Sequence, residues 1–250
     1  MRNKELSYYE KIKNWDFSKI KYETESLTNW DMYKILNKYA TRKSRILDLG
    51  TGGGEKVINK FPNALEIIAT DFSPEMIKTA KENLKKSNKE NIKFKVMDNL
   101  NMNTQDNYFD IVVARHTCID ASQIYKTLKN NGLLILRGVD KLDCWQLKRL
   151  FNCGQAFNDI KPISQVDYEN ILDTGFNNVE LIPIYDREYF KTKEDLLALL
   201  LKTPILADFS EEHKNKGDID MKKLDEYIEK NKTSKGILLR RRYYGIVAKK

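Results

Sequence analysis

The sequence predicts an α/β protein built on a mostly parallel, doubly wound sheet. Three observations indicate this class. Short apolar runs alternate with helical stretches between residues 45 and 139, a glycine cluster directly follows the first run, and polar or helical segments separate the runs, as in βαβ units. A chain of 250 residues is long enough to bury one large core of this kind and to carry an inserted cap.

The first two strands and helices follow one another in the order that a βαβ unit requires. An apolar run at 45–49 stops at the glycine cluster, and helical residues come next. A second run at 65–70 ends at Asp71, after which Ser73 is placed to cap a helix. The alternation of strand and helix is therefore established early in the chain.

Five further runs of strand length complete a sheet of seven strands. Roughly 50 residues separate the last two runs, far more than a hairpin loop uses, and an inserted helical cap explains them. The seven expected strands cover residues 45–49, 65–70, 92–97, 109–114, 132–139, 178–185 and 237–248.

The chain is expected to form one fold, since no repeat, low-complexity tract or linker interrupts it. Its four expected parts are an N-terminal helical lid (1–44), a ligand-binding core (45–192), a helical cap insertion (193–235) and a final core strand (236–250). Within the lid, Thr28 is placed to cap a helix.

Composition excludes several classes of protein. With 41% hydrophobic and 32% charged residues, the chain falls among globular proteins rather than disordered or fibrous ones. No apolar run has the length of a signal peptide core or a membrane span, so a cytoplasmic protein without membrane contacts is expected. The three cysteines form no CxxC pair, which indicates neither a disulfide framework nor a metal site.

The formal net charge of +8 leaves two interpretations open. A cationic surface favours anionic partners such as RNA. Lysine is, however, spread along the whole chain together with asparagine and isoleucine, a texture that biased nucleotide composition produces without selection for binding. In this second interpretation, the positive charge only contributes to solubility.

A glycine turn follows the first strand in the context that a ligand-cradling loop needs. Gly50, Gly52 and Gly54 stand in the pattern DxGxGxG, whereas a dinucleotide fingerprint requires glycine or alanine at the position of Glu55. An acid at the helix start repels the pyrophosphate of NAD, but S-adenosylmethionine has no phosphate and carries a positive sulfonium. The turn therefore favours S-adenosylmethionine.

Five segments in register resemble the successive motifs of class I, Rossmann-like S-adenosylmethionine-dependent methyltransferases. They are ILDLGTGGG, IIATDFSPEMI, FKVMDNLNM, YFDIVVARH and LKNNGLLIL, within residues 46–137. The chain is most similar to bacterial enzymes of this family with unassigned substrates, in the GTGGGE turn, the Arg115-His116 pair and the basic last strand. The resemblance implies an antiparallel last strand, S-adenosylmethionine as cofactor and S-adenosylhomocysteine as product.

Carried over by position, the resemblance also implies cofactor contacts. Residues of the glycine turn would surround the methionine part, and Asp71 would bind the ribose. Phe72 and Met76 would lie against the adenine, Asp98 would accept from its amino group, and Asn99 would offer its backbone beside the ring. The alternatives are a plain helix cap at Asp71 and an ordinary strand end at Asp98. The predicted cofactor-binding residues are Asp48, Gly50, Thr51, Gly52, Asp71, Phe72, Met76, Asp98, Asn99 and Arg115.

The segment after the fourth strand holds the candidates for chemistry. Methyl transfer requires positioning, and a base only if the acceptor keeps a proton. His116 is predicted as that catalytic base, with a histidine that shapes the pocket as the alternative. Arg115 is expected to reach the cofactor carboxylate or an acidic substrate, or else to be exposed without function. Cys118 lacks the preceding proline of the cysteine nucleophile in enzymes that form 5-methylcytosine.

The lid carries aromatic side chains that are expected near the substrate. Tyr8, Tyr9 and Trp15 would close over the transfer site and exclude water, or would only anchor the first helix on the sheet.

Three functional hypotheses follow. The first is methylation of a small molecule at oxygen, nitrogen or carbon, with the region 196–209 capping the pocket. The alternative is RNA-base methylation, supported by charge and by a faint resemblance of residues 200–204 to enzymes that methylate guanine N1 of ribosomal RNA, whose zinc module is lacking here. The basic cluster 240–244 would add phosphate contacts, although alternation along a strand divides it between two faces. The third is a non-catalytic cofactor-binding protein.

Overall fold

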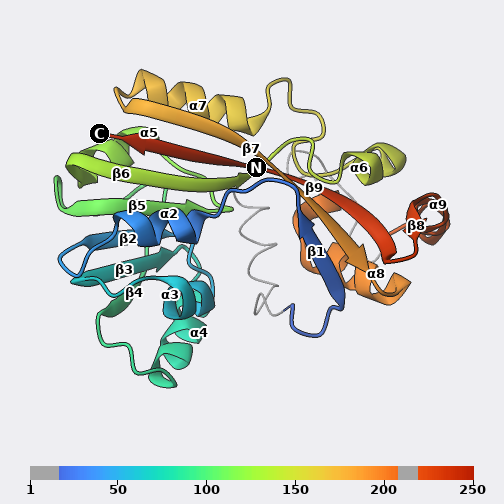
Figure 1. Ribbon diagram of the computed structural model, residues 1–250, viewed down its shortest axis with the longest axis horizontal. Helices are drawn as coiled ribbons and strands as arrows, with labels where there is room; N and C mark the ends of the chain where they lie inside the picture. The colour runs from blue at the N-terminus through green and yellow to red at the C-terminus, as the bar shows by residue number, and fades with distance from the viewer. Residues whose placement is uncertain (1–16, 208–218) are drawn as a thin grey trace. The chain divides into compact units, whose positions relative to one another are not determined.

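The computed structural model describes residues 17–207 and 219–250. They form a mixed α/β fold around one sheet with the strand order β1-β7-β9-β6-β5-β2-β3-β4, and β8 pairs with β9 (Figure 1). The predicted α/β class is confirmed. The strands are β1 (Tyr22–Ser26), β2 (Arg45–Leu49), β3 (Glu66–Asp71), β4 (Ile92–Val96), β5 (Phe109–Arg115), β6 (Leu128–Val139), β7 (Asn177–Phe190), β8 (Lys232–Thr233) and β9 (Gly236–Lys249). The helices are α2 (Met32–Tyr39), α3 (Glu55–Lys60), α4 (Pro74–Lys85), α5 (Ala121–Thr127), α6 (Trp145–Phe151), α7 (Ile163–Asp173), α8 (Lys193–Lys202), the 3-10 turn η1 (Pro204–Leu206) and α9 (Met221–Asn231).

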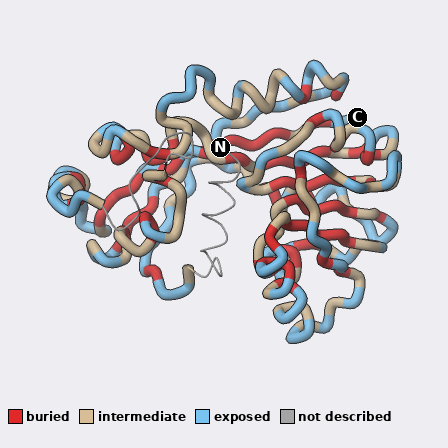
Figure 2. The backbone as a smooth tube through the Cα atoms, turned by 180° about the vertical axis from the view of Figure 1, so that it is seen from behind, coloured by how far each residue is buried: buried red, intermediate tan, exposed pale blue. Residues whose placement is uncertain are grey.

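The chain divides into two compact units. The core unit comprises residues 30–138, 164–182 and 244–250, and the accessory unit comprises the described residues within 1–29, 139–163 and 183–243. Each unit has its own set of buried strands and helices, shown in red in Figure 2. This division differs from the predicted one, because three separate stretches make up the accessory unit rather than the insertion 193–235 alone.

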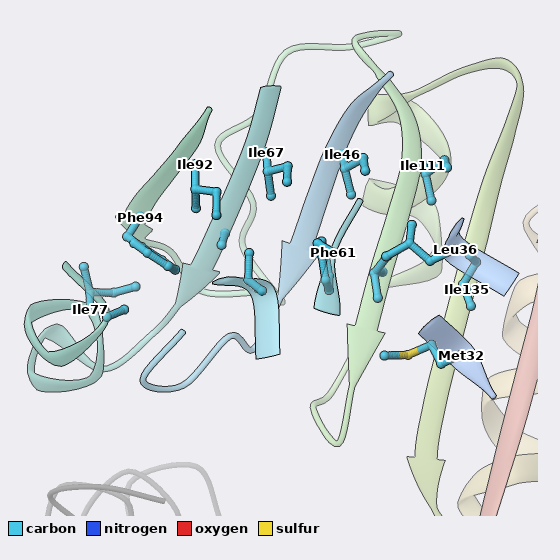
Figure 3. Packing of buried hydrophobic residues seen from close by; sticks show 14 residues of the cluster. Met32, Leu36, Ile46, Phe61, Ile67, Ile77, Ile92, Phe94, Ile111 and Ile135 are labelled. Atoms are coloured by element: carbon cyan, nitrogen blue, oxygen red, sulfur yellow. The ribbon is translucent and has the colours of Figure 1, made fainter. Parts of the chain in front are cut away.

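Parallel strand pairing determines how the core unit packs. β2 pairs with β3 and β5, and the register aligns Ile46 with both Ile67 and Ile111, while Ile92 of β4 stands next to Ile67. Figure 3 shows these four buried side chains in one row across the sheet. Burying an isoleucine side chain contributes roughly 1.5–3 kcal/mol, so a one-residue slip of any strand would lose several such contributions.

The helix after β3 begins where the sequence predicts. The side chain of Ser73 accepts from the backbone N–H of Met76 at 3.3 Å, and Pro74 occupies the first turn. The helix α4 then buries Met76, Ile77 and Ala80. Capping at Ser73 is therefore confirmed, and it positions the loop that follows Asp71.

The last strand runs antiparallel to β6, as predicted. The backbones of Lys250 and Asn131 pair at 3.0 Å, and the N–H of Lys250 reaches the carbonyl of Gly132 at 2.9 Å. Further along, the N–H of Asp140 donates to the carbonyl of Arg242 at 3.1 Å. Residue numbers thus fall along β9 as they rise along β6. Figure 1 shows β9 and β7 pointing in opposite directions.

The accessory unit has a core of its own. Buried leucines of α8 and α9 pack with Leu147 of α6 and with Phe190 and Leu239 of the sheet. Beside them, the guanidinium of Arg241 lies between Asp143, at 2.9 and 3.1 Å, and Glu188, at 2.9 Å, and all three side chains are buried. The insertion predicted at 193–235 does contain the helices α8 and α9.

Two expectations for the N-terminal segment are wrong. Residues 1–44 are not helical throughout, because Tyr22–Ser26 form β1, an edge strand that pairs antiparallel with β7. The helix α2 is capped by Asp31, whose carboxylate accepts from two backbone N–H groups of the first turn. Thr28 instead accepts from the N–H of Tyr185 at 3.1 Å. With β1 and β8, the sheet has two strands more than the seven predicted.

Candidate functional site

The glycine turn after β2 requires glycine at specific positions. Gly50 and Gly54 have φ of +75° and +77°, a left-handed conformation that side chains disfavour. A Cβ on Gly54 would also stand 2.6 Å from the ring of Phe94, and one on Gly50 would stand 2.7 Å from the Cβ of Thr117. The turn therefore brings its backbone closer to these neighbours than any other residue type allows.

Asp71 ties this turn to the end of β3. Its Oδ2 accepts from the N–H of Gly52 at 2.9 Å, and its Oδ1 accepts from the N–H of Ser73 at 3.0 Å. Burial raises the pKa of Asp71, and these two hydrogen bonds oppose the rise. Each carboxylate oxygen retains a lone pair for a further donor. The fixed carboxylate can thus take a pair of ribose hydroxyls, as predicted from its position.

Asp48 is the buried acid beneath the turn, with 5% of its surface exposed. Burial raises the pKa of Asp48 to about 7, against the Thr51 hydroxyl and the Arg115 charge, which lower it. A carboxylate with this pKa has a large desolvation cost that a ligand cation would relieve. The ammonium group of the methionine part of the cofactor is such a cation.

Cationic groups gather at the carboxyl ends of β5 and β6. Arg115 and Arg137 are paired in register, and the positive charges of both lower the pKa of Lys56, after burial as the main cause. His116 follows Arg115 with a left-handed φ of +53°, and its Nε2 contacts Nη1 of Arg137. A guanidinium only donates hydrogen bonds, so Nε2 of His116 is the acceptor in this contact.

The buried polar groups near the turn are incompletely satisfied. Asn99 donates from Nδ2 to the hydroxyl of Thr117 at 2.8 Å, but its buried Oδ1 has no hydrogen-bond partner among residues 17–207 and 219–250. The buried hydroxyl of Tyr33 is likewise without one in that part of the chain. Because buried polar groups are nearly always paired, these atoms indicate a polar ligand.

The structure refines the predicted adenine contacts. Asp98 is half-buried and its Oδ1 accepts from the N–H of Leu100 at 2.9 Å. Phe72 is half-buried and Met76 is buried, both next to Asp71 in the chain. The backbone contact predicted for Asn99 is joined by a side chain that Thr117 holds and whose Oδ1 has no partner among the described residues. These roles remain predictions.

Two contributors were missed by the sequence analysis. Thr117 pairs with Asn99 and packs on Gly50, while Tyr33 is close enough to Arg115 and Asp48 for their charges to affect its pKa, which burial raises. Neither residue belongs to a recognisable motif. The only available signal for Thr117 was its position immediately after the Arg115-His116 pair.

The donor set suits S-adenosylmethionine better than a dinucleotide. Glu55 opens α3, and Asn83 donates to both the Gly53 carbonyl at 2.9 Å and the Glu55 carboxylate at 3.3 Å. This fixed negative charge occupies the place where a Rossmann-type turn binds pyrophosphate. The unpaired Asn99 oxygen, the Asp71 carboxylate and the buried Asp48 offer acceptors for adenine, ribose and ammonium donors.

Some predicted features fall outside this site. Tyr8, Tyr9 and Trp15 lie outside the described residues, so the aromatic lid stays a prediction. Across the two described stretches, no group of histidine, cysteine and acidic side chains is arranged to hold a metal ion. No helix within them is both long and apolar enough to cross a membrane.

Solved structures share this fold at low sequence identity. A candidate methyltransferase from Bacillus halodurans C-125 has a TM-score of 0.59 and 15% identity, with 88% of this chain and 98% of that chain covered. A protein of unknown function from Deinococcus radiodurans R1 has a TM-score of 0.60 and 15% identity over 97% and 98%. Haemonchus contortus phosphoethanolamine N-methyltransferase 2, solved with S-adenosylmethionine, has a TM-score of 0.51 and 20% identity over 88% and 52%.

Sequence comparison identifies the family. No curated protein matches the chain. Residues 40–178, more than half of the chain, match the family model described as a methyltransferase domain. This stretch contains the glycine turn, Asp71, Asn99 and His116, whose geometry suits S-adenosylmethionine as the cofactor. The chain therefore belongs to the methyltransferase domain family, as its motifs predicted.

Proposed function

We propose that the protein transfers a methyl group from S-adenosylmethionine to a small-molecule acceptor, at an oxygen, nitrogen or carbon atom. The observation that carries this proposal is the composition of the strand ends β5 and β6, where Arg115, His116 and Arg137 stand together beside the glycine turn. The Asn/Asp-Pro-Pro-aromatic turn of enzymes that methylate base amines does not occur at this position.

The residues of the site act mainly by binding and orienting. When bound, S-adenosylmethionine supplies a methyl group already activated by the sulfonium. Asp71 would hold the ribose, the Asn99 side chain would accept from the adenine, and Asp48 would face the ammonium group. Each of these groups is held by backbone contacts or burial before any ligand arrives, so little ordering is needed on binding.

His116 is the candidate base for acceptors that carry a proton. The Nε2 lone pair of His116 accepts from Arg137 in the structure. To pass its proton to Nε2, the hydroxyl or ammonium group of the methyl acceptor must therefore replace that guanidinium. Arg137 released in this way could then pair with an anionic part of the acceptor. For methyl acceptors without a transferable proton, His116 and Arg137 would only shape the pocket.

Calorimetric titration separates the proposal from its competitors. The full-length protein is titrated with S-adenosylhomocysteine, with NADH, and with S-adenosylhomocysteine in the presence of total RNA. Binding of S-adenosylhomocysteine alone, unchanged by RNA, supports a small acceptor. RNA-dependent enhancement would contradict the acceptor class, and binding of NADH alone would contradict the donor.

A further inference from the structure

A pocket of about 250 Å³ lies on the accessory unit, where the β8–β9 hairpin meets β7. We call it the hairpin pocket. Its lining combines basic, hydroxyl and apolar side chains, and none of its residues is acidic. The lining residues are Arg187, Tyr189, Thr233, Ser234, Lys235, Leu238 and Arg240.

Strand alternation places the pocket on one face of the accessory sheet. Arg187 and Tyr189 are two residues apart on β7, as are Leu238 and Arg240 on β9, so each pair shares a face. Glu188 and Arg241 alternate with them and form the buried ion pair on the opposite face. The basic cluster of β9 is thus divided, and only Arg240 of these two arginines reaches the pocket.

The charges around the pocket do not balance. Glu25 of β1 lies 3.7 Å from Nη1 of Arg187 and 3.9 Å from Nζ of Lys235, and it accepts the hydroxyl of Tyr189 at 2.8 Å. Its neighbour Glu23 is paired with Lys191 at 2.5 Å. Two carboxylates therefore face four cations, Arg187, Lys191, Lys235 and Arg240, which leaves an excess of two positive charges.

The arginine donors are only partly used. Nη1 of Arg240 donates to Gln146 at 2.7 Å and to Asn231 at 3.1 Å, which holds the guanidinium in place. Its Nε and Nη2 take part in no hydrogen bond with residues of the two described stretches. Nη1 of Arg187 lies 3.7 Å from the Glu25 carboxylate, beyond the range of a strong hydrogen bond, and 45% of the Arg187 side chain is exposed. Both guanidinium groups can thus donate to an added anion.

The hairpin itself is held in a defined conformation. Thr233 donates from its hydroxyl to the Gly236 carbonyl at 2.8 Å and accepts from the N–H of Lys235 at 3.2 Å. Nζ of Lys235 lies 5.2 Å from the ring centroid of Tyr189. The floor made by Tyr189 and Leu238 is buried and apolar. A cationic rim over an apolar floor suits a ligand with one charged end and one organic end.

We propose that the hairpin pocket binds a phosphate monoester carried by a small organic molecule. Such a group carries up to two negative charges, which matches the charge excess, and arginine forks match its oxygens. The cations converge on a single pocket instead of following a track, whereas a nucleic-acid backbone presents phosphates in a row. The apolar floor would contact the organic part. The site lies in the accessory unit, so it does not depend on the methyl-donor site.

Titration of the full-length protein with phenyl phosphate, inorganic phosphate and an eight-residue oligouridylate tests the proposal. Phenyl phosphate should bind saturably and more tightly than inorganic phosphate. Arg187→Gln and Arg240→Gln should each weaken it by about tenfold or more, since each removes a charged hydrogen bond. The matched control is Lys230→Gln, an exposed lysine of α9 paired with Glu226 outside the pocket, which should leave the affinity unchanged. S-adenosylhomocysteine binding checks that each variant is folded.

Several outcomes would overturn the proposal. Equal affinities for inorganic and phenyl phosphate would assign the pocket to free phosphate. Tighter binding of the oligouridylate, lost in the same arginine variants, would assign it to nucleic acid. If Lys230→Gln lost as much affinity for phenyl phosphate as the arginine variants, or if phenyl phosphate did not bind saturably, the positive charges would form no specific site.

Discussion

The buried carboxylate of Asp48 should make cofactor binding depend on pH, and Asp48→Asn should remove this dependence. Its pKa is about 7 without ligand, because burial disfavours the charged form. If the ammonium group of the donor binds only to the ionised carboxylate, the apparent Kd is multiplied by one plus the ratio of protonated to ionised Asp48. Between pH 7.5 and pH 6 this weakens binding by about eightfold, or about 1.3 kcal/mol.

The assay is calorimetric titration with S-adenosylhomocysteine at pH 6, 6.75 and 7.5, on the wild type and on Asp48→Asn. The variant keeps the shape of the side chain but cannot ionise, so its affinity should change little over this range. Titration of the ligand's own amino group affects both proteins equally, and their ratio therefore isolates Asp48. Parallel pH profiles in the two proteins would refute the reasoning.

A stability measurement on the same pair checks the cause of the shift. The folded-state pKa of Asp48 lies above its unfolded value of 3.8, so the folded state holds the extra proton between the two values. The free energy of unfolding of the ligand-free wild type should therefore fall as pH rises from about 4 to about 7. Asp48→Asn should lack this part of the decline and should unfold at a higher temperature than the wild type at pH 8.

Four further substitutions test other parts of the structure. Asp71→Ala should weaken S-adenosylhomocysteine binding by about 1.5–3 kcal/mol, because it removes a charged acceptor, and unchanged affinity in calorimetry would exclude the ribose role. His116→Ala should lower turnover on a protonated acceptor while the donor Kd stays constant, and equal turnover would limit His116 to a structural role. Gly54→Ala should destabilise the fold by about 1–3 kcal/mol in urea unfolding, given its φ of +77° and the overlap with Phe94. Gly53→Ala has no positive φ and meets only the end of the Glu55 side chain, which can shift, so it should cost less. Arg241→Ala should cost about 3–5 kcal/mol, since it leaves Asp143 and Glu188 buried and unpaired, and a loss as small as that of exposed Lys230→Ala would contradict the buried network.

The local pattern of the sequence was sufficient to predict the first strands and the glycine turn of the core unit. The strand predicted at 45–49 has those bounds, and the one predicted at 65–70 is displaced by a single residue. Strands buried on both faces are continuous apolar runs, and the glycine turn, Ser73 and Asp71 are signals within a few residues of one another. The family and its cofactor followed from the same short segments, because the cofactor binds at consecutive strand ends.

The N-terminal part of the accessory unit could not be predicted in this way. β1 is an edge strand of the sequence YETES, with β7 as its partner about 160 positions later, so nothing local distinguishes it from a loop. Asp31 and Thr28 are both common cap types. The structure decides between them, because Asp31 accepts from the N–H groups of Tyr33 and Lys34, while Thr28 accepts from the N–H of Tyr185. Long-range pairing of this kind is determined by the tertiary structure.

The sequence by itself determined the class of fold, the glycine turn, Asp71 and the methyltransferase family. Only the tertiary structure decided the electrostatic state of the charged residues. Asp48 looks like an ordinary strand residue in the sequence, yet burial raises its pKa to about 7 against the opposing charge of Arg115. Arg240 and Arg241 are adjacent and chemically identical, but one lines an open pocket and the other is enclosed by two carboxylates. Burial and charge pairing depend on residues distant in the chain, and a local pattern contains no record of them.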